Sequence, residues 1–359
     1  MYRLKRELYR LKKFVFRSHQ NGLSFPFIII VHAPRVFFNL VYAKLVKWIN
    51  NRVLAVTINK ILIGLFHKNY KNRLGGHFYV IVMPNTLHYL IPCLRLLPDD
   101  LQVFLIFNGT KSWERKIFLN EFSQFPGLKL WTLPRSSIHH GEVINLFFYA
   151  NNANFGIIDH DLYIFDKQIF NHLTLKNDHS MKAIFYGQNR VNGIVYPHTF
   201  FLFFNTVVLK KIMQEYGVDA RIYKKLTPVV QSRLAAIGLT NGQFIKDYIN
   251  FFDTLHVLLA LSYIEGFQVD YIDTDRVYHL GGTSMGSQYT KDLSHMYISM
   301  RFLEFVNHPL LQEKYLPYLA PFTSSEQIRQ KLQPSPDVIQ MQNTLNKILS
   351  LLAESRPDN

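Results

Sequence analysis

The sequence predicts an α/β protein with a mainly parallel central sheet covered by helices. From residue 75 onward, short apolar runs rich in β-branched and aromatic residues alternate with segments of helical length. Strand–helix alternation of this kind produces a parallel sheet with helices packed on its faces. Turn-forming Pro, Asn, Gly or Asp follows most of the apolar runs. With 359 residues, 48% of them hydrophobic, the chain is long enough to enclose a full core.

The expected elements follow one another along the chain. Strands are predicted over residues 78–83, 103–107, 128–133 and 155–158, and helices over 87–97, 111–125 and 137–150. After residue 166 the alternation weakens, and we expect helices over 207–216, over 221–247 with a break at Pro228, and over 254–263, and a strand over 269–272. A last helix has one apolar face, formed by Val338, Met341, Leu345, Ile348 and Leu352.

Charge separates the N-terminal segment from the rest of the chain. Residues 1–74 contain 15 Lys and Arg and one acid, Glu7, for a net charge of +14, whereas residues 75–359 have a net charge of +1. Because residues 75–359 are nearly neutral, we exclude a broad nucleic-acid-binding groove across this part of the chain. Residues 2–17 place Leu4, Leu8, Leu11 and Val15 on one stripe of a basic helix, a pattern typical of helices lying on an anionic membrane surface. Packing of that stripe on the body is the alternative.

These patterns predict three parts. Residues 1–74 form a basic, amphipathic helical segment, 75–322 the α/β domain and 323–359 a helical tail. The apolar stretches before residue 75 are too short or too interrupted to span a bilayer, and no cleavable signal peptide is apparent. The single cysteine, Cys93, excludes a disulfide within the chain and fits a reducing cytosol.

Two carboxylates follow the fourth predicted strand. Asp159 and Asp161 flank His160 directly after the apolar run 155–158, and alternate residues of an extended strand share a face. Open α/β sheets bind ligands at the carboxyl ends of their strands, and paired carboxylate oxygens suit Mg²⁺ or Mn²⁺. The alternative is that the aspartates cap the next segment. A second such pair, Asp273 and Asp275, has a more polar surrounding sequence and is expected in a loop.

Four features in order resemble a known enzyme family. They are a strand ending in Met83-Pro84-Asn85, the Asp159-His160-Asp161 motif about 75 residues later, Asp253 before a helix, and the segment 277–284, Val-Tyr-His-Leu-Gly-Gly-Thr-Ser. Residues 75–285 resemble a glycosyltransferase of the GT-A fold, close to the family-two-like enzymes that use nucleotide sugars. The resemblance implies a single Rossmann-type domain.

The resemblance also implies a role for each residue. Asp161 and His279 would bind the divalent cation that bridges the diphosphate, and Asp159 would contact the sugar or ribose. Asp253 would act as the general base that takes the proton of the acceptor hydroxyl. Pro84, Asn85 and Asn108 would receive the nucleoside, and His140 and Gly141 would contact the nucleotide. Tyr196 and His198 are candidates for an acceptor pocket.

Structural roles compete with several of these assignments. Asp253 can be the N-cap of the helix over 254–263, and the family more often has a Glu-Asp pair where Phe252 precedes Asp253. His279 can be a buried structural histidine, although the following glycines allow backbone N–H groups to approach an anion. Turn formation explains Asn85 and Asn108 equally well.

The sequence therefore predicts a transferase moving a sugar from a nucleoside-diphosphate sugar, with UDP favoured, to a hydroxyl of a glycan or lipid-linked acceptor. We expect Mn²⁺ or Mg²⁺ as cofactor, inversion at the anomeric carbon, and a cytoplasmic location on the inner face of a membrane. One alternative is a non-catalytic membrane-associated protein with a transferase-like fold. The other is a haloacid-dehalogenase-like phosphatase, which would have Thr or Val where this chain has Tyr163.

Overall fold

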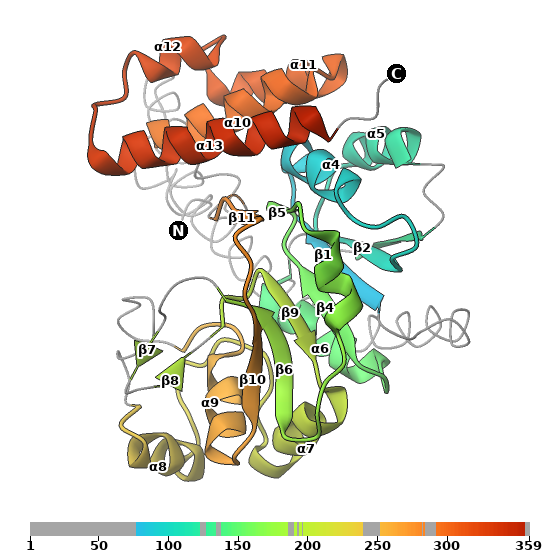
Figure 1. Ribbon diagram of the computed structural model, residues 1–359, viewed down its shortest axis with the longest axis vertical. Helices are drawn as coiled ribbons and strands as arrows, with labels where there is room; N and C mark the ends of the chain where they lie inside the picture. Colours follow the sequence, from blue (N-terminus) through green and yellow to red (C-terminus); the bar gives the residue numbers. More distant parts are fainter. Residues whose placement is uncertain are drawn as a thin grey trace, which may run out of the picture. The chain divides into compact units, whose positions relative to one another are not determined.

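The computed structural model describes residues 77–122, 127–133, 138–185, 190–191, 194–195, 197–239, 252–281, 283 and 292–355 (Figure 1). The chain divides into two compact units, Met1–Leu62 and Ile63–Asn359, and all described residues belong to the second. The N-terminal segment 1–74, Tyr196, and residues 240–247 of the helix predicted over 221–247 lie outside the described residues. Both the amphipathic helices and the three-part division therefore stay predictions.

A seven-stranded sheet is the centre of the second unit. Its spatial order is β10-β6-β9-β4-β1-β2-β3. The strands are β1 (His77–Val82), β2 (Val103–Phe107), β3 (Leu128–Thr132), β4 (Phe155–Ile158), β6 (His179–Ile184), β9 (Phe201–Phe204) and β10 (Gln268–Ile272). Only β9 runs antiparallel to its neighbours, β4 and β6. The prediction of a mainly parallel α/β sheet is confirmed.

Helices cover both faces of the sheet. They are α4 (Leu87–Arg95), α5 (Ser112–Phe122), α6 (His140–Ala150), α7 (Thr206–Tyr216), α8 (Pro228–Ala236), α9 (His256–Ile264), α10 (Leu293–Val306), α11 (Pro309–Leu319), α12 (Ser325–Arg329) and α13 (Pro336–Glu354). Short elements complete the unit: β5 (Leu162–Ile164) paired with β11 (Val277–His279), β7 (Arg190–Val191) paired with β8 (Ile194–Val195), and the 3-10 helix η3 (Lys167–His172). Among the described residues, no helix is both long and apolar enough to cross a membrane.

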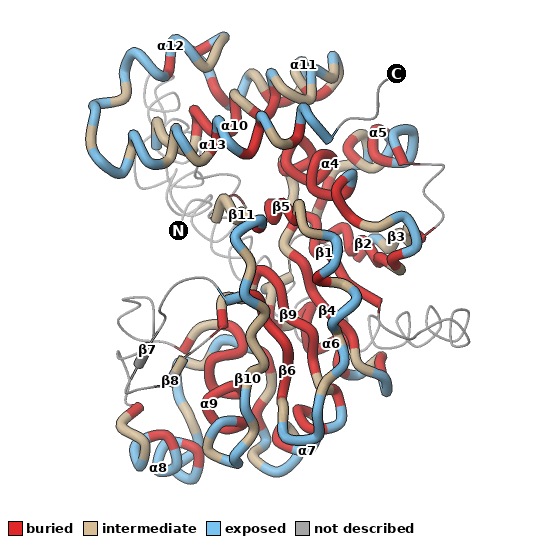
Figure 2. Tube along the Cα trace, viewed as in Figure 1, coloured by how far each residue is buried: buried red, intermediate tan, exposed pale blue. Residues whose placement is uncertain are grey.

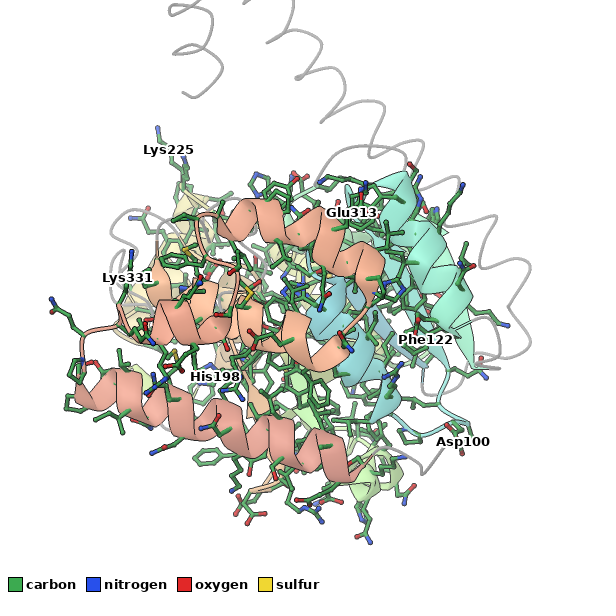
Figure 3. The ribbon with its side chains drawn as sticks, turned by 90° about the horizontal axis from the view of Figure 1, so that it is seen from above. Asp100, Phe122, His198, Lys225, Glu313 and Lys331 are labelled. Atoms are coloured by element: carbon green, nitrogen blue, oxygen red, sulfur yellow. The ribbon has the colours of Figure 1, made fainter. Side chains whose placement is uncertain are left out.

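Two hydrophobic clusters lie on opposite faces of the sheet. In β1, Phe78 and Val80 point into the cluster formed with α4, α5 and α10–α13, while Tyr79 and Ile81 point into the cluster formed with α6–α9. Such alternation is expected of a strand whose two faces are both buried. Figure 2 shows the central strands as buried, with exposed residues on the outer helices. The C-terminal helices are seen from above in Figure 3.

The second half of the chain departs from two predictions. Pro228 does not break a helix but begins α8 at the first position, where its missing N–H is not needed, and Thr227 caps the helix by accepting from the N–H of Val230. Helix α9 begins at His256 instead of residue 254, after Leu255 in the left-handed conformation (φ 68°). The predicted C-terminal helix is confirmed, and its residues Leu345, Ile348 and Leu352 are buried in the core.

Candidate active site

The site lies at one edge of the central sheet. Strands β2 and β4 both pair in parallel with β1, so the carboxyl ends of all three strands lie at the same edge of the sheet. Pro84 and Asn85 follow β1, Asn108 follows β2, and Asp159 follows β4. This edge is where open α/β sheets bind ligands.

The Asp159–Asp161 motif forms a turn instead of extending β4. The strand ends at Ile158, and the turn is held by two backbone bonds, from Asp159 N to Phe200 O at 2.8 Å and from Leu162 N to Asp159 O at 3.2 Å. The turn leads directly into β5. Because the strand does not continue, the expected alternation of side chains does not apply, yet both carboxylates face the same partner.

That partner is His279, which the second sheet brings to the motif. Strand β11 pairs antiparallel with β5, and His279 lies opposite Leu162 in this register. The His279 Nε2 atom is 3.4 Å from Asp161 Oδ1 and 3.6 Å from Asp159 Oδ2. The His279 ring packs on Phe200, with ring centroids 4.7 Å apart, and Phe200 stacks on His198, labelled in Figure 3.

The three side chains fit a divalent cation. One oxygen from each aspartate and one nitrogen from His279 lie within 4.8 Å of one another. Adjacent ligands of an octahedral ion bound at about 2.1 Å are roughly 3 Å apart, so small side-chain shifts would bring all three into coordination. Carboxylates suit Mg²⁺ or Mn²⁺, and a neutral imidazole suits Mn²⁺ better than Mg²⁺. Asp161 is buried, whereas Asp159 and His279 are partly exposed, which leaves one side open to a ligand.

Polar neighbours keep Asp161 ionised. Burial alone would raise the pKa of Asp161, but His279, His160 and the Thr283 hydroxyl together hold that pKa well below its usual range. Thr283 Oγ1 donates to Asp161 Oδ2 at 2.5 Å and lies 3.1 Å from His160 Nε2. His160 Nε2 therefore belongs to the same hydrogen-bonded group as Thr283 and Asp161.

Sequence reasoning did not assign these two positioning residues. In a continued strand His160 would point away from the two aspartates, whereas its side chain is buried and part of the network. Thr283 belongs to the glycine-containing segment singled out for anion binding, and its spacing of 122 residues from Asp161 gives no local signal of their contact.

Asp253 and His140 lie near each other, and His140 also lies near His160. Asp253 accepts from the N–H of Thr254 at 2.8 Å and is not the N-cap of α9, whose N-cap is Leu255. Burial lowers the pKa of His140 to about 4, with a further decrease from His160 and an opposing increase from the charge of Asp253. The general-base role of Asp253 stays a prediction.

His140 and Gly141 begin α6, as predicted. A Cβ atom at Gly141 would lie 2.3 Å from the Ala220 carbonyl oxygen, so close backbone packing explains the glycine without a ligand. The nucleotide contact of both residues stays a prediction.

Asn85 is held in place by a buried glutamate. It adopts the left-handed conformation (φ 64°) directly after Pro84, and its N–H donates to Glu114 Oε1 at 2.6 Å. Its Oδ1 atom accepts from Lys111 Nζ at 3.2 Å. The loop after β1 is therefore fixed, and its contact with a nucleoside stays a prediction.

Asn108 joins the loop after β2 to the segment before α6. Its Oδ1 accepts from the N–H of Ile138 and its Nδ2 donates to the carbonyl of Ile138, both at 2.8 Å. These two hydrogen bonds give the buried Asn108 amide a structural role, in addition to its predicted contact with the nucleoside. The second carboxylate pair, Asp273 and Asp275, is exposed in the loop between β10 and β11, as predicted.

The fold and the site define a class before any relative is considered: an α/β protein with a GT-A-like sheet and a D-x-D motif facing a histidine. Residues 58–209, less than half of the chain, match the family described as the StrH glycosyltransferase N-terminal domain. This match and the fold confirm the predicted resemblance to GT-A glycosyltransferases. No curated protein matches the sequence.

Solved glycosyltransferase structures are similar at low identity. The galactosyltransferase LgtC, in complex with donor and acceptor sugar analogues, is 12% identical, with 71% of this chain and 100% of that chain covered and a TM-score of 0.38. The mannosyltransferase PcManGT from Pyrobaculum calidifontis, in complex with GDP-Man and Mn²⁺, is 10% identical (84% and 94% covered, TM-score 0.36). TarS from S. aureus, in complex with UDP-GlcNAc, is 13% identical (78% and 82% covered, TM-score 0.32). TM-scores this low carry no argument about the chemistry of this chain.

Proposed function

We propose that the protein is a glycosyltransferase that moves a sugar from a nucleoside-diphosphate sugar to a hydroxyl group. The observation that carries the proposal is the convergence of Asp159, Asp161 and His279 at the carboxyl edge of the sheet. The family match over residues 58–209 supports sugar transfer, and the resemblance seen in the sequence implies a nucleotide sugar as the donor, with UDP as the favoured base.

Asp161 and His279, with Asp159 beside them, would hold Mn²⁺ or Mg²⁺. A cation held there supplies positive charge that stabilises the departing diphosphate. The chain's own contribution is to keep Asp161 ionised and oriented, through Thr283 and His160. In this proposal Asp159 also contacts the ribose or the donor sugar.

Inverting transfer needs one base and no protein acid. An oxygen of the acceptor hydroxyl forms a bond to the anomeric carbon, the bond from that carbon to the diphosphate oxygen breaks, and the hydroxyl proton passes to a carboxylate. In this proposal Asp253 is that carboxylate. Pro84, Asn85 and Asn108 bind the nucleoside, and His140 and Gly141 lie beside the nucleotide.

A thermal-shift screen tests the donor site. We expect a nucleoside diphosphate, UDP first, to raise the melting temperature when Mn²⁺ is present and much less when it is absent, because a ligand that binds only the folded state stabilises it by mass action. Asp161→Asn should remove the metal-dependent part of the shift, and Glu121→Gln, on the outer side of α5, should retain it. Equal shifts in wild type and Asp161→Asn would contradict the proposal.

The proposed acceptor and location rest on the net charge of the N-terminal segment. A net charge of +14 over residues 1–74 favours attachment to an anionic membrane surface from the cytoplasmic side, next to a lipid-linked or envelope glycan acceptor. If deletion of residues 1–74 leaves co-sedimentation with anionic vesicles unchanged, this part of the proposal is wrong.

A further inference from the structure

A basic stretch without acidic residues follows α7 in the chain and includes α8. Residues 220–239, here called the basic segment, contain Arg221, Lys224, Lys225 and Arg233 and no Asp or Glu. Their net charge is +4, whereas the remainder of residues 75–359 has a net charge of −3. The slight excess of positive charge in the α/β body therefore depends on this one stretch.

Exposed aliphatic side chains accompany the cations of the basic segment. Lys224 and Lys225 are exposed in the loop before α8, and Figure 3 shows Lys225 extending away from the rest of the unit. Val229, in the first turn of α8, is 65% exposed, and Ile222 is 37% exposed. Val229 and Arg233 are four residues apart, so they share one face of the helix. The segment thus presents positive charge and apolar surface together.

Two of the four cations have acidic neighbours. Arg221 Nε lies 2.7 Å from Asp219 Oδ2. Arg233 lies near Tyr216, whose hydroxyl donates to Glu265. Because these carboxylates offset part of the charge of the two arginines, the lysines at positions 224 and 225 supply most of the attraction for an external anion.

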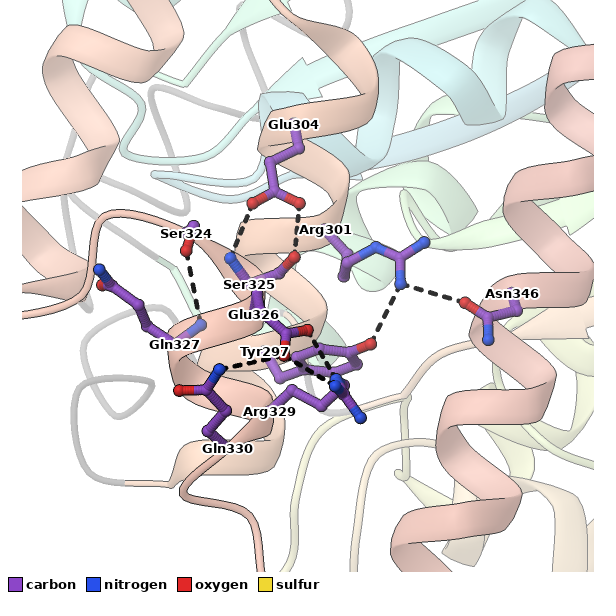
Figure 4. Close-up of polar contacts among 10 residues, drawn as sticks. All are labelled: Tyr297, Arg301, Glu304, Ser324, Ser325, Glu326, Gln327, Arg329, Gln330 and Asn346. Atoms are coloured by element: carbon purple, nitrogen blue, oxygen red, sulfur yellow. Dashed lines mark hydrogen bonds and ion pairs between the residues drawn. The ribbon is translucent and has the colours of Figure 1, made fainter.

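The C-terminal helices differ in charge from the basic segment. Residues 292–355 contain five Lys and Arg and six Asp and Glu. Arg329 donates to Glu326 from Nε and from Nη2, each at 2.7 Å, and Arg301 donates to Asn346 Oδ1 at 3.1 Å (Figure 4). These arginines are engaged within the protein, so the C-terminal helices provide a comparison surface.

Backbone hydrogen bonds attach the basic segment to the candidate active site. The N–H of Tyr223 donates to the Phe252 carbonyl at 3.0 Å, and the N–H of Phe252 donates to the Tyr223 carbonyl at 2.8 Å. The N–H of Leu255 donates to the Ala220 carbonyl at 3.1 Å. These bonds lie on both sides of Asp253 in the sequence. A surface that binds the basic segment is therefore held close to the proposed general base.

Cations mixed with aliphatic side chains favour a lipid surface. Each Lys or Arg near an anionic bilayer raises the affinity about fivefold, and aliphatic side chains enter the boundary between headgroups and acyl chains. Single-stranded nucleic acid would instead be bound by aromatic rings on which bases stack. The one aromatic residue of the basic segment, Tyr223, is partly buried, and its hydroxyl donates to Asp219 Oδ1 at 3.0 Å.

We propose that the basic segment docks the α/β body on an anionic lipid bilayer. Val229 and Ile222 lie at the level of the headgroups, and Lys224 and Lys225 lie against the lipid phosphates. This contact is separate from the one proposed for residues 1–74. Its consequence for catalysis rests on the proposed function: docking brings the loop that carries the general base to the bilayer that holds a lipid-linked acceptor.

A fluorophore on α8 tests the proposal in the full chain. Cys93 is the only cysteine and is completely buried, so a cysteine at an exposed position can be labelled selectively with an NBD probe. Val229→Cys places the probe on the basic segment. Ile339→Cys is the matched control, because residue 339 is 50% exposed on α13, at the other end of the unit from α8 in Figure 1.

The probe is read with two kinds of vesicle. On equal parts of phosphatidylcholine and phosphatidylglycerol, the probe at residue 229 should shift its emission to the blue and be quenched by nitroxide-labelled lipid, and on phosphatidylcholine alone it should do neither. The probe at residue 339 should stay unchanged on both. An unchanged spectrum at residue 229, or equal changes at the two positions, would overturn the proposal. A response at residue 229 to poly(U) RNA but not to vesicles would overturn it in favour of a nucleic-acid surface.

Removal of charge gives a second readout. Lys224→Gln combined with Lys225→Gln, in the labelled Val229→Cys protein, should lower the vesicle affinity at least tenfold, since two contributions of about fivefold are lost. Lys314→Gln combined with Lys331→Gln removes the same charge from the region of the C-terminal helices and should lower the affinity less than about twofold, because distant charges are screened. Equal losses in the two double variants would overturn the proposal. Unchanged melting temperatures confirm that both variants are folded.

Nucleotide binding separates this proposal from the proposed function. The vesicle measurements contain no nucleotide, so a wild type without the Mn²⁺-dependent UDP thermal shift rejects the proposed function alone. A probe at residue 229 that ignores anionic vesicles, in a protein that keeps the UDP shift, rejects the docking surface alone.

Discussion

Removal of the Glu114 carboxylate should destabilise the end of β1 and the packing of α11 together. Glu114 is completely buried and accepts three hydrogen bonds. The donors are the N–H of Asn85 at 2.6 Å, the N–H of Lys111 at 2.7 Å and the Tyr315 hydroxyl at 2.6 Å. One side chain therefore connects the loop after β1, the beginning of α5 and a helix about 200 residues later in the sequence.

The expected cost follows from these donors. A buried donor left without a partner costs about 1–3 kcal/mol, so Glu114→Ala should lower the free energy of unfolding by at least about 3 kcal/mol. In Glu114→Gln the amide oxygen can replace Oε1, which accepts two of the bonds, so the loss should be only about 1–3 kcal/mol. Tyr315→Phe removes one bond and should cost a similar amount.

Urea unfolding followed by tryptophan fluorescence measures these differences. The control is Glu121→Ala on the same helix, where the carboxylate pairs with Arg95 at the surface at 3.1 Å and should contribute less than about 1 kcal/mol. A Glu114→Ala variant no less stable than Glu121→Ala would refute the assigned role of Glu114.

Three further changes have defined outcomes. Gly156→Ala should lower the free energy of unfolding in urea by about 1–3 kcal/mol, because the added Cβ would lie 2.1 Å from the Phe78 ring. An unchanged free energy of unfolding would contradict this packing. Thr283→Val should weaken Mn²⁺ binding about 10–100-fold by calorimetry and Thr283→Ser should restore it, since the hydroxyl orients Asp161; equal affinities would reject that role. Burial lowers the pKa of His88 from 6.5 to about 3, so as the pH falls this histidine takes up a proton in the unfolded chain before it does so in the folded protein. Between pH 7 and 5 the free energy of unfolding of the wild type should therefore fall by about 2 kcal/mol more than that of His88→Gln. Curves of unfolding free energy against pH that run parallel for the two proteins would contradict this.

The first half of the fold could be predicted from the sequence because its signals are local. The apolar runs before Pro84, Asn108 and Asp159 coincide with β1, β2 and β4, since each strand is buried on both faces and ends in turn-forming residues. The sequence pattern is weaker in the second half. The antiparallel insertion of β9 depends on pairing with β4 and β6, which no local pattern encodes.

The candidate site could be predicted in its residue types but not in its support. The sequence named Asp159, Asp161 and His279, and the structure brings them together. It could not reveal that Thr283 orients Asp161, because the contact joins residues far apart in the chain.

The late position of β11 has a consequence for how the protein acquires its chemistry. The stretch that matches the glycosyltransferase family, residues 58–209, contains both aspartates but neither His279 nor Thr283. A chain emerging from the ribosome would complete β4 and still lack the third side chain of the candidate site until more than a hundred further residues had been made. A fragment ending before β11 would keep both aspartates of the motif without the histidine that faces them.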